Sequence, residues 1–284
     1  SRKRALIPVG HTGTEFIAKF QAKADELGIP VITNMKAEEL IKDKDGRVVG
    51  VKATMDGSEY TFNAKGGVVL ATGGFGANPE MVKKYNPKID ERFKTTDAPG
   101  STGEALYMAE RAGAQLVNMG YIQTYPICDP ISGAIELIAD ARFDGAIMLN
   151  QEGKRFVEEL QRRDVLSEAI LNQTGRYCWV LWNDNIGKIS NTVKAHANEY
   201  EAFTKQGIMT TCDDLKCIAD FTKIPFDQLR KTVKRVSDMA GKGNDKDFNH
   251  RSGLVDMQQG KYYVIKAVPS THHTMGGVRI NEKA

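Results

Sequence analysis

A short unbroken apolar run at residues 68–71 (Val-Val-Leu-Ala) leads directly into a glycine-rich turn at residues 72–76 (Thr-Gly-Gly-Phe-Gly). Such a run predicts a strand that is buried on both faces, as in a parallel sheet. Open α/β sheets bind ligands in the crevice beyond the carboxyl ends of their strands, and glycine allows the backbone to approach a ligand closely. The combination predicts an α/β fold with a cofactor at this turn, although a plain structural turn explains the loop alone equally well.

The chain falls into two parts that differ in their pattern of predicted helices and strands, and the change lies near Ile127. Hydrophobic periodicity and turn signals predict, in the first part, a helix at 14–27, a strand at 29–33, a hairpin of 48–55 and 60–62, helices at 78–84 and 103–112, and an extended segment at 116–125. The second part has helices beginning near Asp164, Asn185, Asp213 and Pro225, strands at 178–181 and 262–267, and a loop at 269–277. This order favours an α/β part followed by an α+β part.

Composition excludes several classes of protein. Of the 284 residues, 41% are apolar and 26% are charged, which is enough hydrophobic material for a full core. A net charge of +3 is too mild for nucleic-acid binding, and no run approaches the roughly 20 apolar residues of a membrane span. The four cysteines form no C-x-x-C pair, and Cys212 and Cys217 would point in different directions on a helix. We therefore expect buried free thiols, with no disulfide and no metal site.

Five motifs then occur in one order along the chain. They are Ala71-Thr-Gly-Gly-Phe75, Pro99-Gly-Ser-Thr-Gly103, Tyr121-Ile-Gln-Thr-Tyr-Pro126, Asn150-Gln-Glu-Gly-Lys-Arg-Phe156 with Arg163-Asp164, and His272-His-Thr-Met-Gly-Gly277. This set resembles the flavoprotein subunits of the fumarate reductase and succinate dehydrogenase superfamily. Within it, the chain is most similar to the soluble flavocytochrome c-type branch that includes the urocanate reductases, and the resemblance runs nearly end to end.

The resemblance implies FAD as cofactor and an α/β, Rossmann-like flavin-binding domain with an inserted α+β capping domain. It places a partial FAD-binding domain at 1–119, the capping and substrate domain at 120–271, and a return to the FAD-binding domain at 272–284. No G-x-G-x-x-G follows an opening strand, and the family's second substrate arginine would lie beyond Ala284. We therefore expect an incomplete flavin domain, as in a piece of a longer polypeptide. A cytoplasmic and a periplasmic location both stay open.

Two arginines are catalytic by this resemblance. Arg163 matches the arginine that protonates the substrate carbon after hydride transfer from the flavin N5. Arg142 matches the arginine that feeds protons through a glutamate. The family's Thr-Glu pair falls here on Ile138 and Ala139, with Asp140 one position later, so the usual carboxylate relay is absent.

Three further residues are implied to bind the substrate. His272 matches the histidine that holds the substrate carboxylate. Tyr125 and Asp140 match the pair found in urocanate-type members, and Tyr125 replaces the histidine that binds the distal carboxylate of fumarate. An aspartate accepts a hydrogen bond from an imidazole N–H and repels a second carboxylate. We therefore favour urocanate over fumarate.

The resemblance also implies a set of flavin contacts. They are Lys36, Ala37, Ala71, Thr72, Gly73, Gly74, Thr96, Asp97, Gly100, Gly103 and His273. The other histidines, His11, His196 and His250, lie outside any motif and are expected to be surface or structural residues. The aromatic residues Phe75, Trp179 and Trp182 lie in apolar runs and are expected in the core.

The function implied is FAD-dependent reduction of the C=C bond of an unsaturated carboxylic acid, with urocanate converted to imidazole propionate. The alternatives are a fumarate reductase or another reductase of α,β-unsaturated acids, and, in a different class, a non-catalytic fragment unable to hold FAD. A steroid dehydrogenase is disfavoured because Arg163 and His272 suit a carboxylate. No haem motif or iron–sulfur cysteine set is present, so we expect an external electron donor: a haem, an FMN domain or reduced flavin.

Overall fold

The description that follows rests on a computed structural model, which describes residues 13–283. The chain divides into two compact units, Ser1–Leu70 and Ala71–Ala284, and each is described by itself. None of the helices found over residues 13–283 is both long and apolar enough to cross a membrane.

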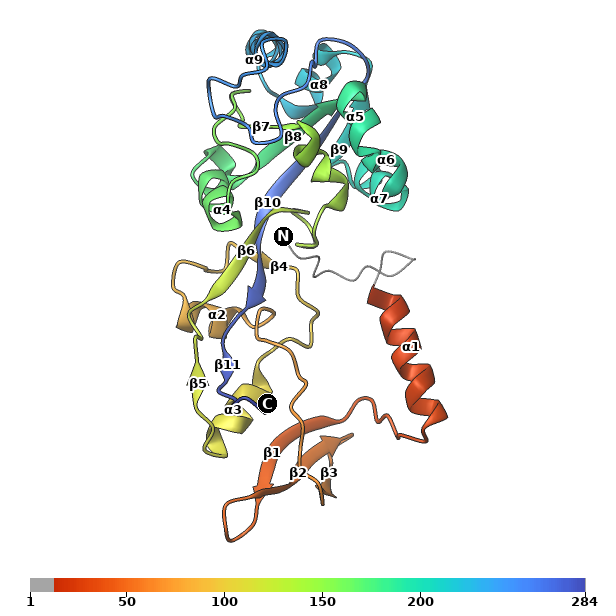
Figure 1. Ribbon diagram of the computed structural model, residues 1–284, viewed down its shortest axis with the longest axis vertical. Helices are drawn as coiled ribbons and strands as arrows, with labels where there is room; N and C mark the ends of the chain where they lie inside the picture. Colours follow the sequence, from red (N-terminus) through yellow and green to blue (C-terminus); the bar gives the residue numbers. More distant parts are fainter. Residues whose placement is uncertain (1–12, 284) are drawn as a thin grey trace. The chain divides into compact units, whose positions relative to one another are not determined.

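The N-terminal unit joins one helix to a small antiparallel sheet (Figure 1). Helix α1 (Gly13–Glu26) confirms the predicted helix, and β1 (Lys36–Lys42), β2 (Val48–Met55) and β3 (Ser58–Asn63) pair in the order β1-β2-β3. The predicted hairpin is confirmed, because Met55 pairs with Ser58 and leaves Asp56-Gly57 as a two-residue turn. Both turn residues have positive φ, 51° and 78°, as a tight hairpin turn requires.

Two predicted strands in this region are wrong. Residues 29–33 form no strand, and Ile29, Val31 and Ile32 are at least half exposed. The run 68–71 is also extended without strand pairing, and Val69 is 89% exposed. An apolar run becomes a strand only when a neighbouring strand takes its backbone hydrogen bonds, and none of the strands described over residues 13–283 does so here.

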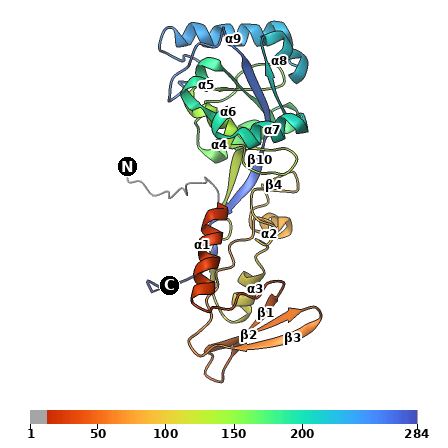
Figure 2. The ribbon, with the colours of Figure 1, turned by 90° about the vertical axis from the view of Figure 1, so that its right-hand side faces the viewer.

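The C-terminal unit is organised around one long strand, β10 (Tyr262–Thr274), which Figure 2 shows running from the helices α8 and α9 towards β4. Its first half pairs antiparallel with β8 (Cys178–Asn183) and β9 (Met209–Cys212), and β7 (Ile147–Leu149) extends the sheet beyond β8. Its second half pairs antiparallel with β6 (Ile122–Cys128) and parallel with β4 (Lys94–Thr95). The predicted strands at 178–181 and 262–267 are confirmed, but the second is much longer than predicted.

The helices of this unit include six that begin within two residues of a predicted start, and the sequence patterns did not predict the rest. The helices are α2 (Pro79–Tyr85), α3 (Glu104–Arg111), α4 (Arg163–Leu171), α5 (Asp184–Ser190), α6 (Thr192–Ala195), α7 (Ala197–Gln206), α8 (Leu215–Thr222), α9 (Phe226–Ala240), and the 3-10 segments η1 (Leu137–Asp144) and η2 (Thr174–Arg176). Strands β5 (Leu116–Val117) and β11 (Gly277–Val278) form a separate antiparallel pair. Asn78 caps α2, because its side chain accepts a hydrogen bond from the Met81 amide at 3.0 Å.

Two hydrophobic cores fill this unit. The larger one surrounds β8 and β10 and includes Trp179 and Trp182, and the smaller one includes Phe75, Met81 and Leu106. Phe75, Trp179 and Trp182 are all buried, which confirms them as core residues.

The prediction of free thiols is wrong for one pair of cysteines. Cys212 and Cys217 form a disulfide, whereas Cys128 and Cys178 are buried and free as expected. The spacing argument placed Cys212 and Cys217 on one helix. Instead Cys212 ends β9 and Cys217 lies in the first turn of α8, so the turn between them brings their Cα atoms to 5.7 Å.

A buried ion cluster joins the connection that follows α9 to the segment that precedes α4. Arg155 donates to both carboxylate oxygens of Glu159 at 2.7 Å and to Asp245 at 2.9 and 3.2 Å, and all three side chains are almost fully buried. His250 lies in the same cluster, with its Nε2 3.7 Å from Glu159, and burial lowers its pKa. His250 is therefore a structural residue, as predicted, whereas His11 lies outside the described residues.

We predict that Glu159→Ala destabilises the fold by about 3–5 kcal/mol, because it leaves the buried Arg155 charge without its bidentate partner. Glu152→Ala is the matched control: Glu152 forms an exposed pair with Lys154, and its loss should cost less than about 1 kcal/mol. Chemical denaturation of both variants measures the difference. Equal losses of stability would contradict the structural role of the cluster.

Glu136 is a second buried charge, and it lies without a compensating cation. Its side chain is buried, and neither carboxylate oxygen has a hydrogen-bond partner among the described residues. Burial raises the pKa of this carboxyl well above its ordinary value, and the charges of Asp129 and Glu199 add to the effect. The folded protein therefore holds a proton on Glu136 to a higher pH than the unfolded chain does.

We predict that this proton makes the folded state less stable as the pH rises. Below a pH of about 4.5, Glu136 is protonated in both the folded and the unfolded state. Above this pH only the unfolded state releases the proton. The free energy of unfolding then falls by about 1.4 kcal/mol for each pH unit, until the pH reaches the raised pKa of the folded state. Glu136→Gln should flatten this loss above a pH of about 4.5. The exposed Glu201→Gln should leave the pH profile of unfolding unchanged, and a Glu136→Gln profile that matches the unmodified protein would contradict the assignment.

Candidate functional site

Three segments that are distant in the sequence meet at the glycine turn of the C-terminal unit. The Phe75 amide donates to the Thr274 Oγ1 at 3.2 Å, and the Ala77 amide donates to the Ser101 carbonyl at 3.0 Å. The turn at 71–76 therefore contacts both the end of β10 and the loop at 96–103. We call these three segments the glycine cradle.

Glycine is required at three places in the cradle. A Cβ on Gly74 would overlap with the Thr274 Oγ1, and a Cβ on Gly76 would overlap with the Asp97 Oδ2. Gly103 has a positive φ of 75°, and a Cβ there would lie 2.6 Å from the Phe75 Cβ. Burial raises the pKa of Asp97, although His273 and the Gly76 amide oppose the shift. The backbone of this turn can approach its neighbours only because no side chain intervenes.

The cradle contains most of the predicted flavin contacts. Gly73, Gly74, Asp97, Gly103 and His273 lie in it or against it, and Thr96 reaches the neighbouring histidine. Ala71, Thr72 and Gly100 belong to the same segments but are exposed. Lys36 and Ala37 begin β1 in the N-terminal unit, so their contact with a cofactor stays a prediction.

The two adjacent histidines lie on β10 and not on a loop, which corrects the prediction for 269–277. Thr271 pairs with Thr124 and His273 with Gln123, so two steps along β10 match one step along β6 and His272 is the extra residue of a β-bulge. Neighbouring residues on a regular strand point to opposite faces. The bulge instead brings the two imidazole rings to 3.7 Å between centroids.

Arg163 is held above the Tyr125 ring. Its Nη1 donates to the Gln123 Oε1 at 2.7 Å, and its guanidinium carbon lies 4.6 Å from the centre of the Tyr125 ring. Gln123 and Tyr125 are two positions apart on β6, so they lie on one face of the strand. The Tyr125 ring also contacts His272 edge to face, with 5.2 Å between centroids. These contacts bring the predicted residues Arg163, Tyr125 and His272 together.

Arg163 begins α4 between two oppositely charged neighbours. Arg162 and Asp164 form a bidentate ion pair with both distances at 2.7 Å, and both side chains are exposed. The Arg163-Asp164 motif is therefore not an ion pair between adjacent residues.

Asp140 and Arg142, both on η1, are electrostatically linked to Tyr125. Burial raises the pKa of Tyr125 first of all, the Asp140 charge adds to this, and Arg142 opposes it. Burial also raises the pKa of Asp140, and Arg142, His196 and Arg163 oppose that shift. Arg142 itself is buried and donates to the Glu159 carbonyl at 3.1 Å. The five predicted catalytic and substrate residues thus form one cluster.

His272 is neutral at physiological pH. Burial lowers its pKa to about 4, and the nearby His273 and Arg163 contribute in the same direction. Its Nδ1 lies 2.7 Å from the Thr96 Oγ1. A neutral imidazole can bind an anion only through its single N–H.

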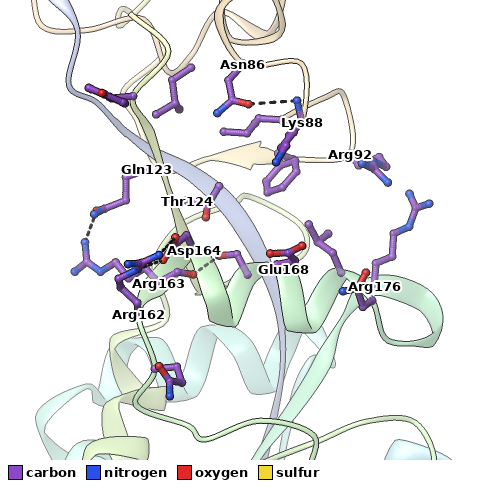
Figure 3. Close-up of a pocket in the computed structure, with 18 of the residues that line it drawn as sticks. Asn86, Lys88, Arg92, Gln123, Thr124, Arg162, Arg163, Asp164, Glu168 and Arg176 are labelled. Carbon is purple, nitrogen blue, oxygen red and sulfur yellow. Dashed lines mark hydrogen bonds and ion pairs between the residues drawn. The ribbon is translucent and has the colours of Figure 1, made fainter. Parts of the chain in front are cut away.

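A cavity of about 1080 Å³ adjoins the cluster (Figure 3). Arg142, Arg163 and Gln123 belong to its lining, and Lys88, Arg92 and Arg176 add positive charge. Figure 3 shows Arg163 and Gln123 joined at one side of the cavity, with Arg92 and Arg176 at the other. The cavity therefore suits an anionic ligand, with basic groups outnumbering Asp164 and Glu168.

Sequence reasoning missed several of these residues. Gln123 lies in the Tyr121–Pro126 motif, and strand alternation from Tyr125 could have identified it. Lys88, Arg92 and Arg176 lie outside the motifs, and no pattern in the sequence brings them to one cavity.

Residues 2–284 match the FAD binding domain family. The chain belongs to the FAD binding domain family. FAD is therefore its cofactor, and the glycine cradle fits this group because its exposed backbone at 71–73 is free of large side chains. Known members of the family resemble the chain over nearly its full length.

The chain is 41% identical to the urocanate reductase of Eggerthella lenta, over 99% of the chain and 47% of that protein. It is 34% identical to a fumarate reductase (cytochrome) of Shewanella frigidimarina, over 100% of the chain and 48% of that protein. Its structure is similar to the open conformation of a flavocytochrome c3 fumarate reductase, with a TM-score of 0.83 and 31% identity over 99% of the chain and 49% of that structure. The chain thus has a fumarate reductase-like, FAD-binding fold and spans about half the length of the curated relatives it matches.

We predict that Gly74→Ala weakens FAD binding. The added methyl group would displace Thr274 from the cradle, and such overpacking costs about 1–3 kcal/mol, or roughly 5–150-fold in affinity. The visible absorbance of the purified, FAD-loaded protein measures the bound flavin. Gly66→Ala is the control, because a Cβ there meets nothing within 4 Å. Full flavin occupancy in Gly74→Ala would contradict the role of the cradle.

Proposed function

We propose that this chain is the part of an FAD-dependent reductase that reduces the C=C bond of an unsaturated carboxylic acid, with urocanate as the favoured substrate. The observation that carries the proposal is the cluster of Arg163, Tyr125 and His272 beside Asp140, next to a cavity with positively charged walls. Relatives named urocanate reductase and fumarate reductase support the same reaction class.

The reaction adds two electrons and two hydrogens across the double bond. FAD, when bound and reduced, supplies a hydride to one of the two olefinic carbons. Arg163 donates the proton to the other carbon, since its guanidinium is the cationic donor held in the cluster. An arginine has a pKa above about 12, so the proton must be replaced at once. The cavity that Arg163 lines gives water a route for this replacement.

The substrate carboxylate binds to neutral His272 and to the positive charge of Arg163. His272 donates one hydrogen bond, and Arg163 balances the negative charge that moves towards the carboxylate as the double bond is reduced. This arrangement stabilises the reacting acid more strongly in the transition state than before it.

Asp140 and Tyr125 favour an imidazole at the other end of the substrate. An ionised Asp140 accepts a hydrogen bond from an imidazole N–H, and Arg142 and Arg163 support its charge against burial. The same charge repels the second carboxylate of fumarate. Urocanate, a planar acrylate that carries an imidazole, fits both requirements.

The helical part of the chain acts as the cap of the site in this proposal. Residues 120–271 form the capping and substrate domain, and residues 1–119 and 272–284 belong to the flavin domain. The electrons come from an external donor, a haem, an FMN domain or reduced flavin.

The test follows flavin reoxidation in the anaerobic, FAD-loaded protein with urocanate or fumarate as oxidant. Asp140→Ala should slow oxidation by urocanate by about 10–100-fold, the worth of a hydrogen bond to a charged group. It should leave oxidation by fumarate unchanged or faster. Arg163→Gln should abolish both reactions, and Arg230→Gln on the exposed face of α9 is the matched control.

Two outcomes would contradict the proposal. Faster oxidation by fumarate than by urocanate in the unmodified protein would favour a fumarate reductase, which the identity to the Shewanella frigidimarina enzyme also supports. A folded but colourless protein after incubation with FAD would favour a fragment that cannot hold the cofactor.

A further inference from the structure

Thr96 lies directly against the histidine that binds the carboxylate in the proposed function. The Thr96 Oγ1 is 2.7 Å from the His272 Nδ1, which is a short and well-formed hydrogen bond. We propose that Thr96 is a positioning residue that fixes His272 in the tautomer with its proton on Nε2, so that the imidazole donates a hydrogen bond to the substrate carboxylate. This inference rests on the proposed function.

The backbone fixes the hydroxyl in place. Strand β4 pairs parallel with β10, with Thr95 opposite Thr271, and the Thr96 amide donates to the Thr271 carbonyl at 2.9 Å. Thr96 therefore directly follows the pairing that leads into the β10 bulge. The pairing of β4 with β10 therefore sets the position of Thr96 at the start of the loop at 96–103.

The direction of the hydrogen bond follows from the number of protons. A threonine hydroxyl carries one proton, and a neutral imidazole carries one, on either Nδ1 or Nε2. If Nδ1 held the proton, Nε2 would present a lone pair to the substrate carboxylate and repel it. If the hydroxyl donates to Nδ1, its proton is used and Nε2–H becomes a donor. Only the second arrangement allows His272 to bind an anion while neutral.

The surroundings of the ring support this arrangement. The His273 ring lies 3.7 Å away, and the Tyr125 ring contacts His272 edge to face at 5.2 Å. Burial above all, and then the charges of His273 and Arg163, lower the pKa of His272 and disfavour a second proton on the imidazole. His272 can therefore bind the acid only as a neutral hydrogen-bond donor, so its single N–H must face the substrate.

The first measurement reads the tautomer without any turnover. Histidine-selective ¹⁵N labelling of the FAD-loaded protein, with His272→Asn to assign the signal, distinguishes a protonated Nε2 from a protonated Nδ1. We expect His272 to carry its proton on Nε2 in the unmodified protein and in Thr96→Ser, which keeps the hydroxyl. In Thr96→Val we expect a mixture of tautomers. A His272 protonated on Nδ1 in the unmodified protein overturns the proposal, whether or not any variant folds.

The second measurement separates binding from chemistry. Loss of one hydrogen bond of about 0.5–1.5 kcal/mol should raise KM for the unsaturated acid about 2–10-fold in Thr96→Val, with kcat changed less than KM. Thr96→Ser should restore KM. Thr210→Val, at a half-buried position on β9, is the matched control and should leave KM unchanged. An unchanged KM in Thr96→Val, or a failure of Thr96→Ser to restore it, overturns the proposal.

These experiments also separate the inference from the proposed function. A protein that reduces none of the acids, but whose His272 changes tautomer in Thr96→Val and not in Thr96→Ser, supports the positioning role while the proposed function fails. A protein that reduces the acids but whose tautomer is unaffected by Thr96→Val overturns the positioning role alone.

Discussion

The pairing of β10 along both of its edges is the constraint on which the C-terminal unit depends. Its first half joins β8 and β9, and its second half joins β4 and β6. The strands that pair with the second half, and β10 itself, carry or precede residues of the site. Tyr125 and Gln123 lie on β6, Thr96 follows β4, and His272 lies on β10 itself. The spacing within the cluster is therefore set by backbone hydrogen bonds, which hold positions more rigidly than loops do.

The same strand also decides what the site residues can do chemically. The bulge at His272 turns a regular strand into one that presents two neighbouring imidazoles to each other, and the burial that results keeps His272 neutral. Arg163, in contrast, comes from the start of α4 and is held by Gln123 and the Tyr125 ring. A neutral donor and a cation thus both contact one aromatic ring, each fixed by a different element.

Patterns of neighbouring residues in the sequence correctly predicted the elements that turn residues and hydrophobic periodicity specify. The Asp56-Gly57 hairpin and most of the helices of the C-terminal unit follow from turn chemistry and periodicity. The length of β10 could not be predicted in this way, because Pro269 and the polar residues after it are typical of a loop. Proline is tolerated there since the register shifts between Val268 and Ser270, where its missing N–H is not needed by a regular ladder. The bulge and the basic cavity depend on contacts between distant segments, which periodicity does not encode. The disulfide is local, but it depends on the turn between β9 and α8, which the spacing of the two cysteines alone does not reveal. The site residues themselves came from the motifs, and the strand pairing explains why they meet.

The exposed ion pair between Arg162 and Asp164 has a consequence for the residue between them. Such a pair adds little to the free energy of unfolding. It does, however, occupy the carboxylate nearest in sequence to Arg163, with both oxygens bound by Arg162. Arg163 instead donates to the neutral amide of Gln123, so its charge is oriented without being cancelled. The surface pair thus keeps the Asp164 carboxylate from pairing with Arg163 and leaves this guanidinium to the groups of the cluster.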